Sequence, residues 1–279
     1  MLKKIRSLAY EHAIPAAFII FIVFDLLLLG VGQLLSLLPK TLPIQFLSET
    51  IIMILPAALV VFFGFSGAFK KGNFLRGILC ILPYLGVQLF TMWVVFSKMM
   101  VNTDAVWQPW YQIVYGLFAV FGVGFREECI YRATIQNVLA KKYANSVKGI
   151  WITVMISSII FGLSHAPNLF FGVAPLAVLI QIVKASAVGL LFGAVYLRSG
   201  NIWVLILVHT LTDIAGLAPS TFLRNISDVE NVNQLSISWG SLLFDLLYVA
   251  LAVFLLRPSK CKQIYQNLCF AEERSEDTK

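Results

Sequence analysis

The chain has 279 residues, of which 59% are hydrophobic and only 13% are charged, and its formal net charge is +7. Soluble domains carry about 25% charged residues, so this chain has too few polar side chains to cover a water-facing surface. Its basic residues lie between apolar segments and form no patch with interleaved aromatics, which argues against nucleic-acid binding. Composition therefore predicts an all-α, polytopic integral membrane protein.

Eight apolar segments are long enough to cross a bilayer. A helix needs about 20 apolar residues, within roughly 17–25, to span ~30 Å of hydrocarbon. The first segment follows a basic start, as a signal peptide would, but it is too long to be a cleavable segment, so we expect a retained helix. We predict a bundle of about eight transmembrane helices, at 14–38, 45–68, 76–97, 108–130 or longer, 149–165, 173–197, 201–218 and 238–256.

Lysine and arginine are distributed unevenly between the two sides of this bundle. Fifteen of them fall in the connections on the side of the N-terminus, and only Lys40, Lys98 and Arg224 fall on the other side. Cytoplasmic loops are enriched in these residues, so the pattern predicts that both termini are cytoplasmic. We expect a multi-pass protein of a plasma membrane.

Few ionisable side chains lie inside the apolar segments. Inserting one such side chain into the membrane costs about 2.5–3.5 kcal/mol, so each of them calls for a structural or functional explanation. Asp25, Lys184 and Asp245 stand alone in the sequence, and no role is assigned to them. The others form three groups, which lie in the fourth, fifth and seventh segments.

The first group is Arg126-Glu127-Glu128 with Arg132, in a stretch that can stay helical to about Ala140. Glu128 and Arg132 are i,i+4 neighbours and can pair, whereas Glu127 points about 100° away and is available for chemistry. If the helix continues to Ala140, Glu127 lies roughly 20 Å from that end, at a depth that the fifth segment can match. If the helix ends near Ile130, Glu127 and the fifth segment's His165 cannot lie at the same depth in the membrane.

The second and third groups each place a histidine one helical turn from a partner. Phe161 and His165 share a face of the fifth segment, and His209 and Asp213 share a face of the seventh. Taken alone, Glu-Glu-x-x-x-Arg would be an interfacial cluster, His165 a helix-end residue, and His209 with Asp213 a polar pair that locks two helices together. The last interpretation is weaker in a membrane, where buried charge-capable pairs are commonly functional.

Together the three groups supply what a water-activating site needs. Glu127 can serve as the general base for a water that attacks a peptide carbonyl. His165 and His209 can ligate a divalent metal or donate hydrogen bonds to the developing oxyanion. A catalytic zinc site commonly has three protein ligands and an open position, and His165, His209 and Asp213 could supply three. The zincin motif H-E-x-x-H is absent.

The three motifs, in this order on three helices, resemble the CPBP family of intramembrane peptidases, which includes the type II CAAX prenyl endopeptidases and bacteriocin-processing proteins. The resemblance covers about Val106 to Leu217. It implies that Glu127 activates water, that Glu128 and Arg132 support it, and that His165 and His209 are catalytic or bind a metal. Asp213 stands where the family often has Asn, and a carboxylate there favours a metal. A metal-free mechanism is also argued for this family.

These features predict an intramembrane endopeptidase that cleaves a hydrophobic or lipidated peptide beside membrane lipid, with zinc as the expected metal. The short loops fit a bacterial plasma membrane, where we expect a role in bacteriocin or peptide-signal maturation or in self-immunity. The alternatives are a non-catalytic immunity or scaffold protein and a proton-coupled transporter. We divide the chain into three helices in 1–107, a catalytic bundle in 108–256 and a solvated cytoplasmic tail in 257–279.

Overall fold

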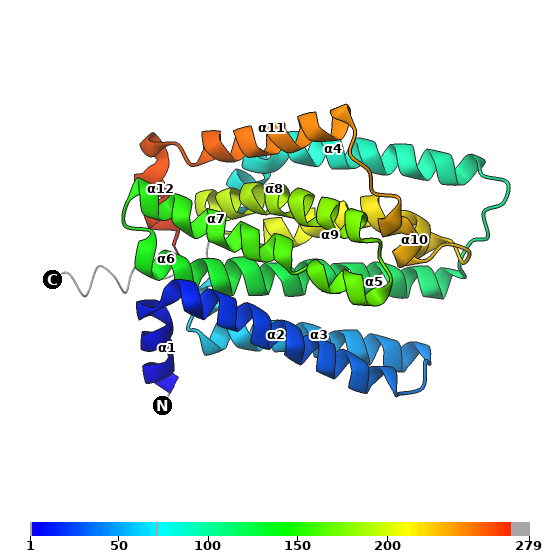
Figure 1. Ribbon diagram of the computed structural model, residues 1–279, viewed down its shortest axis with the longest axis horizontal. Coiled ribbons are helices and arrows are strands. Elements are labelled where there is room, and N and C mark those ends of the chain that lie inside the picture. Colours follow the sequence, from blue (N-terminus) through cyan, green and yellow to red (C-terminus); the bar gives the residue numbers. More distant parts are fainter. Residues whose placement is uncertain (1, 71, 269–279) are drawn as a thin grey trace.

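The computed structural model describes residues 2–70 and 72–268, and within these ranges it contains helices and no strand (Figure 1). The predicted all-α bundle is thereby confirmed. The α-helices are α1 (Leu2–Glu11), α2 (Ala13–Ser36), α3 (Leu42–Phe62), α4 (Phe74–Val101), α5 (Trp110–Glu128), α6 (Asn137–Tyr143), α7 (Val147–Leu163), α8 (Pro175–Ser199), α9 (Ile202–Phe222), α10 (Asp228–Asn233), α11 (Trp239–Leu255) and α12 (Cys261–Asn267). Four short elements complete the set: η1 (Ser66–Phe69), η2 (Cys129–Gln136), η3 (Ala166–Phe171) and η4 (Pro258–Lys260).

Six helical segments of the described chain are long and apolar enough to cross a membrane: α2, α3, α4, α7 together with η3, α8 and α9. A seventh is counted if α11 and Pro258–Asn267, which meet at a bend of 54°, form one span. The protein is therefore a multi-pass membrane protein, although the predicted count of eight is not confirmed. The difference arises because α5 ends in charged residues and α11 is only 17 residues long.

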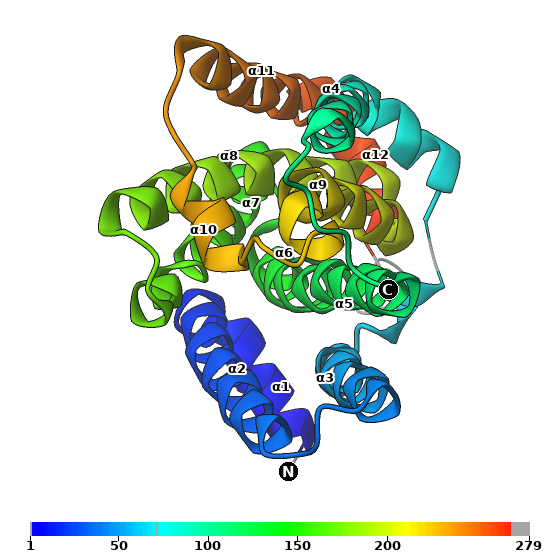
Figure 2. The same cartoon turned by 90° about the vertical axis from the view of Figure 1, so that its right-hand side faces the viewer.

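The helices of the bundle surround a centre formed by α5, α7, α8 and α9. Viewed from one end, α2 and α3 lie on one side of this centre, and α4 and α11 lie on the other (Figure 2). Helix α8 packs against α7 and α11, and α9 packs against α4 and α5. Side chains on the outer helices face outward, such as Ile19 and Leu26, which are 60% and 62% exposed. Such a surface suits contact with lipid, so the polar side chains of the centre are shielded from it.

The fourth predicted segment is one long helical stretch. Helix α5 continues through η2, which is π-helical, into α6, so the chain is helical from Trp110 to Tyr143. The alternative of a helix that ends near Ile130 is therefore wrong. All eight residues of η2 are buried. Stretches of π-helix are rare and frequently lie at functional sites, and this one begins directly after Glu128.

The segment from Arg257 onward is not the solvated tail that we predicted. Helix α12 folds back onto α8, and Ile264 within it is fully buried. The side chain of Asn267 donates hydrogen bonds to the carbonyl oxygens of Leu197 and Arg198 at the end of α8, at 3.2 and 2.6 Å. The prediction overlooked three apolar residues at helical spacing, Cys261, Ile264 and Leu268, which the short helix buries. The rest of the predicted tail lies outside the described residues.

Candidate active site

Glu128 lies at the centre of a buried polar cluster between α5 and α9. Its side chain is fully buried, and one carboxylate oxygen is 3.4 Å from Nε of Arg132, as the i,i+4 spacing predicted. The other oxygen is 2.7 Å from Nδ1 of His209. A carboxylate can only accept, so Nδ1 carries the hydrogen and Nε2 is the nitrogen left for other partners. Glu128 thus fixes the orientation of His209 and compensates the charge of Arg132.

Aromatic rings enclose the guanidinium of Arg132 within η2. Its central carbon lies 4.3 Å from the ring centroid of Phe161 and 5.7 Å from that of Phe192, both within cation–π range. The ring of Phe161 also meets the imidazoles of His165 and His209 edge-on, with centroid distances of 5.6 and 5.8 Å. Phe161 therefore links the three sequence motifs through direct packing.

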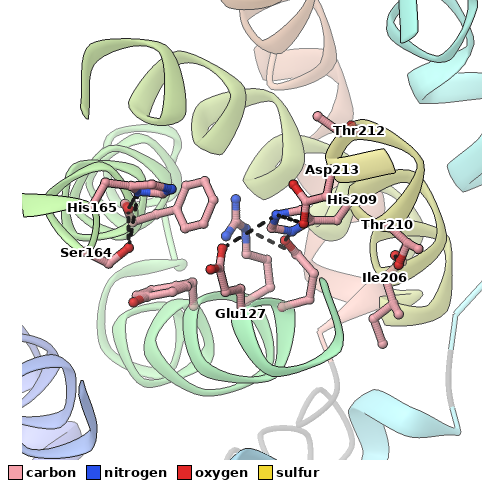
Figure 3. Close-up of polar contacts among 12 residues, drawn as sticks. Glu127, Ser164, His165, Ile206, His209, Thr210, Thr212 and Asp213 are labelled. Carbon is pink, nitrogen blue, oxygen red and sulfur yellow. Dashed lines mark hydrogen bonds and ion pairs between the residues drawn. The ribbon is translucent and has the colours of Figure 1, made fainter. Parts of the chain in front are cut away.

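Two further carboxylates lie near Nε2 of His209. Oε2 of Glu127 is 3.5 Å from this nitrogen, and Oδ2 of Asp213 is 3.7 Å from it (Figure 3). Unlike Glu128, Glu127 keeps 20% of its side chain exposed. The two neighbouring glutamates thus have different surroundings: Glu128 is buried in the protein interior, and Glu127 faces a cavity. This is the division of roles that the helical geometry predicted.

His165 approaches the same cavity from another helix. It follows the end of α7, and its Nδ1 lies 3.2 Å from the carbonyl oxygen of Phe161. The carbonyl can only accept, so Nδ1 carries the hydrogen and Nε2 is the free acceptor. The cavity has a volume of about 620 Å³ and is lined by Glu127, His165, His209 and Asp213 together. The structure therefore brings four of the six predicted site residues to one cavity, with Glu128 and Arg132 behind its wall.

The predicted metal ligands do not form a three-ligand site in this arrangement. Within residues 2–70 and 72–268, no three or more His, Cys, Asp or Glu side chains are grouped to hold a metal ion. Of the expected set His165, His209 and Asp213, the last two lie close together, with 3.7 Å between Nε2 of His209 and Oδ2 of Asp213. The zinc site therefore stays a prediction, and the steps proposed below use the groups of the chain itself.

The residues without a predicted role acquire partners in the structure. Lys184 lines the cavity, and its Nζ lies 3.0 Å from Oδ2 of Asp245 on α11. Asp25 accepts a long hydrogen bond of 3.5 Å from the hydroxyl of Tyr131 in η2. Sequence analysis also missed Glu49, an ionisable residue inside the second apolar segment. The rule that each ionisable side chain at membrane depth needs a reason could have found it.

Comparison with known proteins agrees with this geometry. Residues 108–215 match the family described as type II CAAX prenyl endopeptidase Rce1-like. This region includes α5, η2, α7, α8 and all six predicted site residues. No curated protein and no solved structure matched the chain. The match over residues 108–215 supports the resemblance of this multi-pass membrane protein to the CPBP family of intramembrane endopeptidases, which its three motifs indicated.

Proposed function

We propose that this protein hydrolyses a peptide bond of a hydrophobic or membrane-associated peptide in the cavity lined by Glu127, His165, His209 and Asp213. The observation that carries the proposal is the pairing of the two glutamates. Glu127 is open to the cavity beside an imidazole that the fully buried Glu128 holds in place. A base and an oriented hydrogen-bonding group at one cavity wall are the minimum that peptide hydrolysis requires.

Glu127 is the general base of the proposed reaction. Its carboxylate takes a proton from a water whose oxygen then forms a bond to the scissile carbonyl carbon, and the carbonyl becomes an oxyanion. When that intermediate collapses, the C–N bond breaks and the leaving amine takes the proton from Glu127. Base catalysis of this kind contributes roughly 10²–10⁴-fold in rate.

His209 and Asp213 form the candidate oxyanion site. When His209 is protonated, its Nε2–H is a donor at the cavity wall, held in position by the 2.7 Å contact between Nδ1 and Glu128. Asp213 lies one turn further along α9 and has a buried oxygen, Oδ2, without a hydrogen-bond partner in the described chain. A protonated Asp213 would be a second donor. Each such donor is worth roughly 10²–10³ in kcat.

His165 is placed to act on the other side of the same substrate. Its Nδ1–H is engaged by the Phe161 carbonyl, so Nε2 can accept a hydrogen bond from the attacking water or from the scissile amide. A hydrogen bond of this kind orients the reacting group before the bond changes. We therefore assign His165 to orientation and His209 to charge stabilisation.

The cellular role is proposed from charge distribution and cavity character. The basic side of the bundle supports cytoplasmic termini, and the short loops support a bacterial plasma membrane. A cavity of about 620 Å³ between apolar helices suits a hydrophobic leader peptide, so we propose maturation of a bacteriocin or signalling peptide, or self-immunity. A transporter would use the same residues to relay protons, and a scaffold would use them only for packing.

The test compares the purified wild type with Glu127→Ala and with Asp104→Ala, an exposed control outside the site. After equal folding is checked by thermal melting, each is incubated with a library of hydrophobic leader peptides and cleavage is read by mass spectrometry. Cleavage by wild type and control but not by Glu127→Ala is expected. A divalent metal such as zinc remains a prediction, which a chelator arm tests.

The opposite result would redirect the assignment. If folded wild type cleaves no peptide across the library, hydrolysis is rejected, and a proton-flux assay in liposomes then separates transporter from scaffold. If Glu127→Ala cleaves as the wild type does, Glu127 is not the base.

A further inference from the structure

A second cavity adjoins the proposed active site. It has a volume of about 410 Å³ and lies between α3, α5 and α9. Its lining residues Gln108, Thr221 and Asp228 stand just before α5, near the end of α9 and at the start of α10. Helix α10 lies at the end of the bundle away from both termini (Figure 1). Val123, Arg126, Leu217 and Asp228 line both cavities, so the two spaces share a wall.

Two ionisable side chains, Glu49 and Arg126, line this second cavity and act on each other only through space, without a hydrogen bond or close ion pair between them. Glu49 of α3 lines it, and its buried Oε2 accepts no hydrogen bond from any described residue. Arg126 also lines it, and no ion pair or hydrogen bond joins its guanidinium to another residue of the described chain. Buried polar atoms left unpaired cost about 1–3 kcal/mol each, and more when charged. At membrane depth, such side chains face water-filled cavities.

The size and lining of the cavity suit water. A water molecule occupies about 30 Å³ in the liquid and needs two to four polar partners. Gln112, Tyr115 and Ser220 add hydrogen-bonding groups to those of Glu49 and Arg126. The α5 wall of the cavity includes the small residues Gly116 and Ala119, and Thr221 of α9 packs against Gly116.

A hydrolase inside a membrane needs a route for water that its other substrate does not block. A peptide bound in the 620 Å³ cavity would cover the opening through which Glu127 meets solvent. Arg126 immediately precedes Glu127 and lines both cavities. Water held in the second cavity is therefore one side chain away from the proposed base while the peptide is bound.

We propose that the cavity lined by Glu49 and Arg126 is a water reservoir that supplies the attacking water to Glu127 from the side opposite the bound peptide. This inference rests on the proposed peptidase function. Glu49 acts through the water that it binds and is a positioning residue. It lies on α3, outside the matched family region.

The first arm of the test measures hydration and does not depend on activity. Ala119→Cys places a thiol in the second cavity, and Val114→Cys places one on the outer face of the same helix, where Val114 is 50% exposed. A cationic, membrane-impermeant methanethiosulfonate reacts with thiolates, which form in water and not in detergent chains. With adducts located by peptide mass mapping, position 119 should label at least tenfold faster than position 114. Equal or slower labelling at 119 overturns the proposal.

The second arm measures turnover. Ala119→Phe fills the cavity and should lower kcat at least tenfold with little change in the KM for the peptide, whereas Val114→Phe should leave both unchanged. Glu49→Leu should lower kcat in the same way, and Glu49→Gln, which still binds water, should restore most of it. Wild-type kcat in both Ala119→Phe and Glu49→Leu overturns the proposal. If the wild type cleaves no peptide, the peptidase function fails, and labelling still decides whether this cavity holds water.

Discussion

Glu127 and Glu128 are neighbours in sequence, yet they belong to two different regions of the molecule. Glu128 lies with Arg132 behind the cavity wall, fully buried, with one oxygen hydrogen-bonded to His209 and the other 3.4 Å from Nε of Arg132. Glu127 lies with Asp213 on the cavity side, where each keeps 20% of its side chain exposed. Both regions meet at the imidazole of His209. The comparison shows that the ionisable residues of this site divide into a buried set and an accessible set, to which we assign positioning and reaction respectively.

The largest expected effect concerns the accessible side. Glu127→Gln keeps the shape of the side chain but removes the base, so kcat should fall by roughly 10²–10⁴-fold. The free energy of unfolding should change little, because the contacts of the fully buried Glu128 with Arg132 and His209 stay intact. Kinetics on a cleaved peptide, together with thermal melting, measure both. A large loss of stability with retained turnover would reverse the two roles.

Glu128→Ala should affect stability first. It leaves the fully buried Arg132 without its carboxylate partner, and breaking a buried pair in this way costs about 3–5 kcal/mol. The pair Glu128→Leu with Arg132→Met should recover most of that stability, since apolar replacements of buried pairs are often neutral. It should not recover turnover, because nothing then holds Nδ1 of His209. Recovery of full activity in the double variant would show that Glu128 only neutralises charge.

Asp213 provides a finer test of the cavity side. Asp213→Ala should lower kcat by roughly 10²–10³-fold if the side chain is an oxyanion donor. Asp213→Asn keeps a donor at the same place, so its kcat should stay within about tenfold of wild type. Steady-state kinetics of the two variants decide the point. If Asn is as damaging as Ala, a carboxylate is required, and a ligand role for Asp213 gains support.

The smallest effect is expected at the periphery of the cavity. Lys184 and Asp245 join α8 to α11 at 3.0 Å, but their side chains remain 25% and 18% exposed. Water screens such a pair, so Lys184→Met should cost no more than about 1 kcal/mol. A double-mutant cycle with Asp245→Asn, read by thermal melting, gives the coupling. A coupling free energy above about 2 kcal/mol would show that Lys184 and Asp245 behave like the buried pairs of the site.

The sequence predicted the parts of the site that depend on helical spacing. Glu128 with Arg132 and His209 with Asp213 are each one turn apart on a continuous helix, so periodicity alone placed them together. The contact between Glu128 and His209 joins residues 81 positions apart on two helices, and no local pattern encodes it. The site was therefore predictable within each helix and not between helices.

The fold was predicted to a similar extent. Apolar length placed a helix at every predicted segment, because hydrocarbon thickness sets the minimum run. Length could not decide which of these helices cross the bilayer, and α5 shows why, since its last turn carries Arg126 and two glutamates. The length of apolar runs also gave no indication that the short helix α12 packs against α8 and buries Ile264.

The π-helical stretch η2 has a consequence for the phase of the long helix. In an α-helix each residue advances the chain by about 100°, whereas a π-turn accommodates one extra residue before the next hydrogen bond. The carbonyl of Cys129, which accepts from the Thr134 hydroxyl five residues on, marks this wider turn. Deleting one residue within η2 would let α-helical hydrogen bonding resume with the half that carries Glu127 and the half that carries Asn137 still in phase, whereas a deletion in an α-helical part of the stretch would turn the residues on its two sides by about 100° relative to each other. The π-helical turn thus takes up one residue within the long helix without turning the glutamates away from His209.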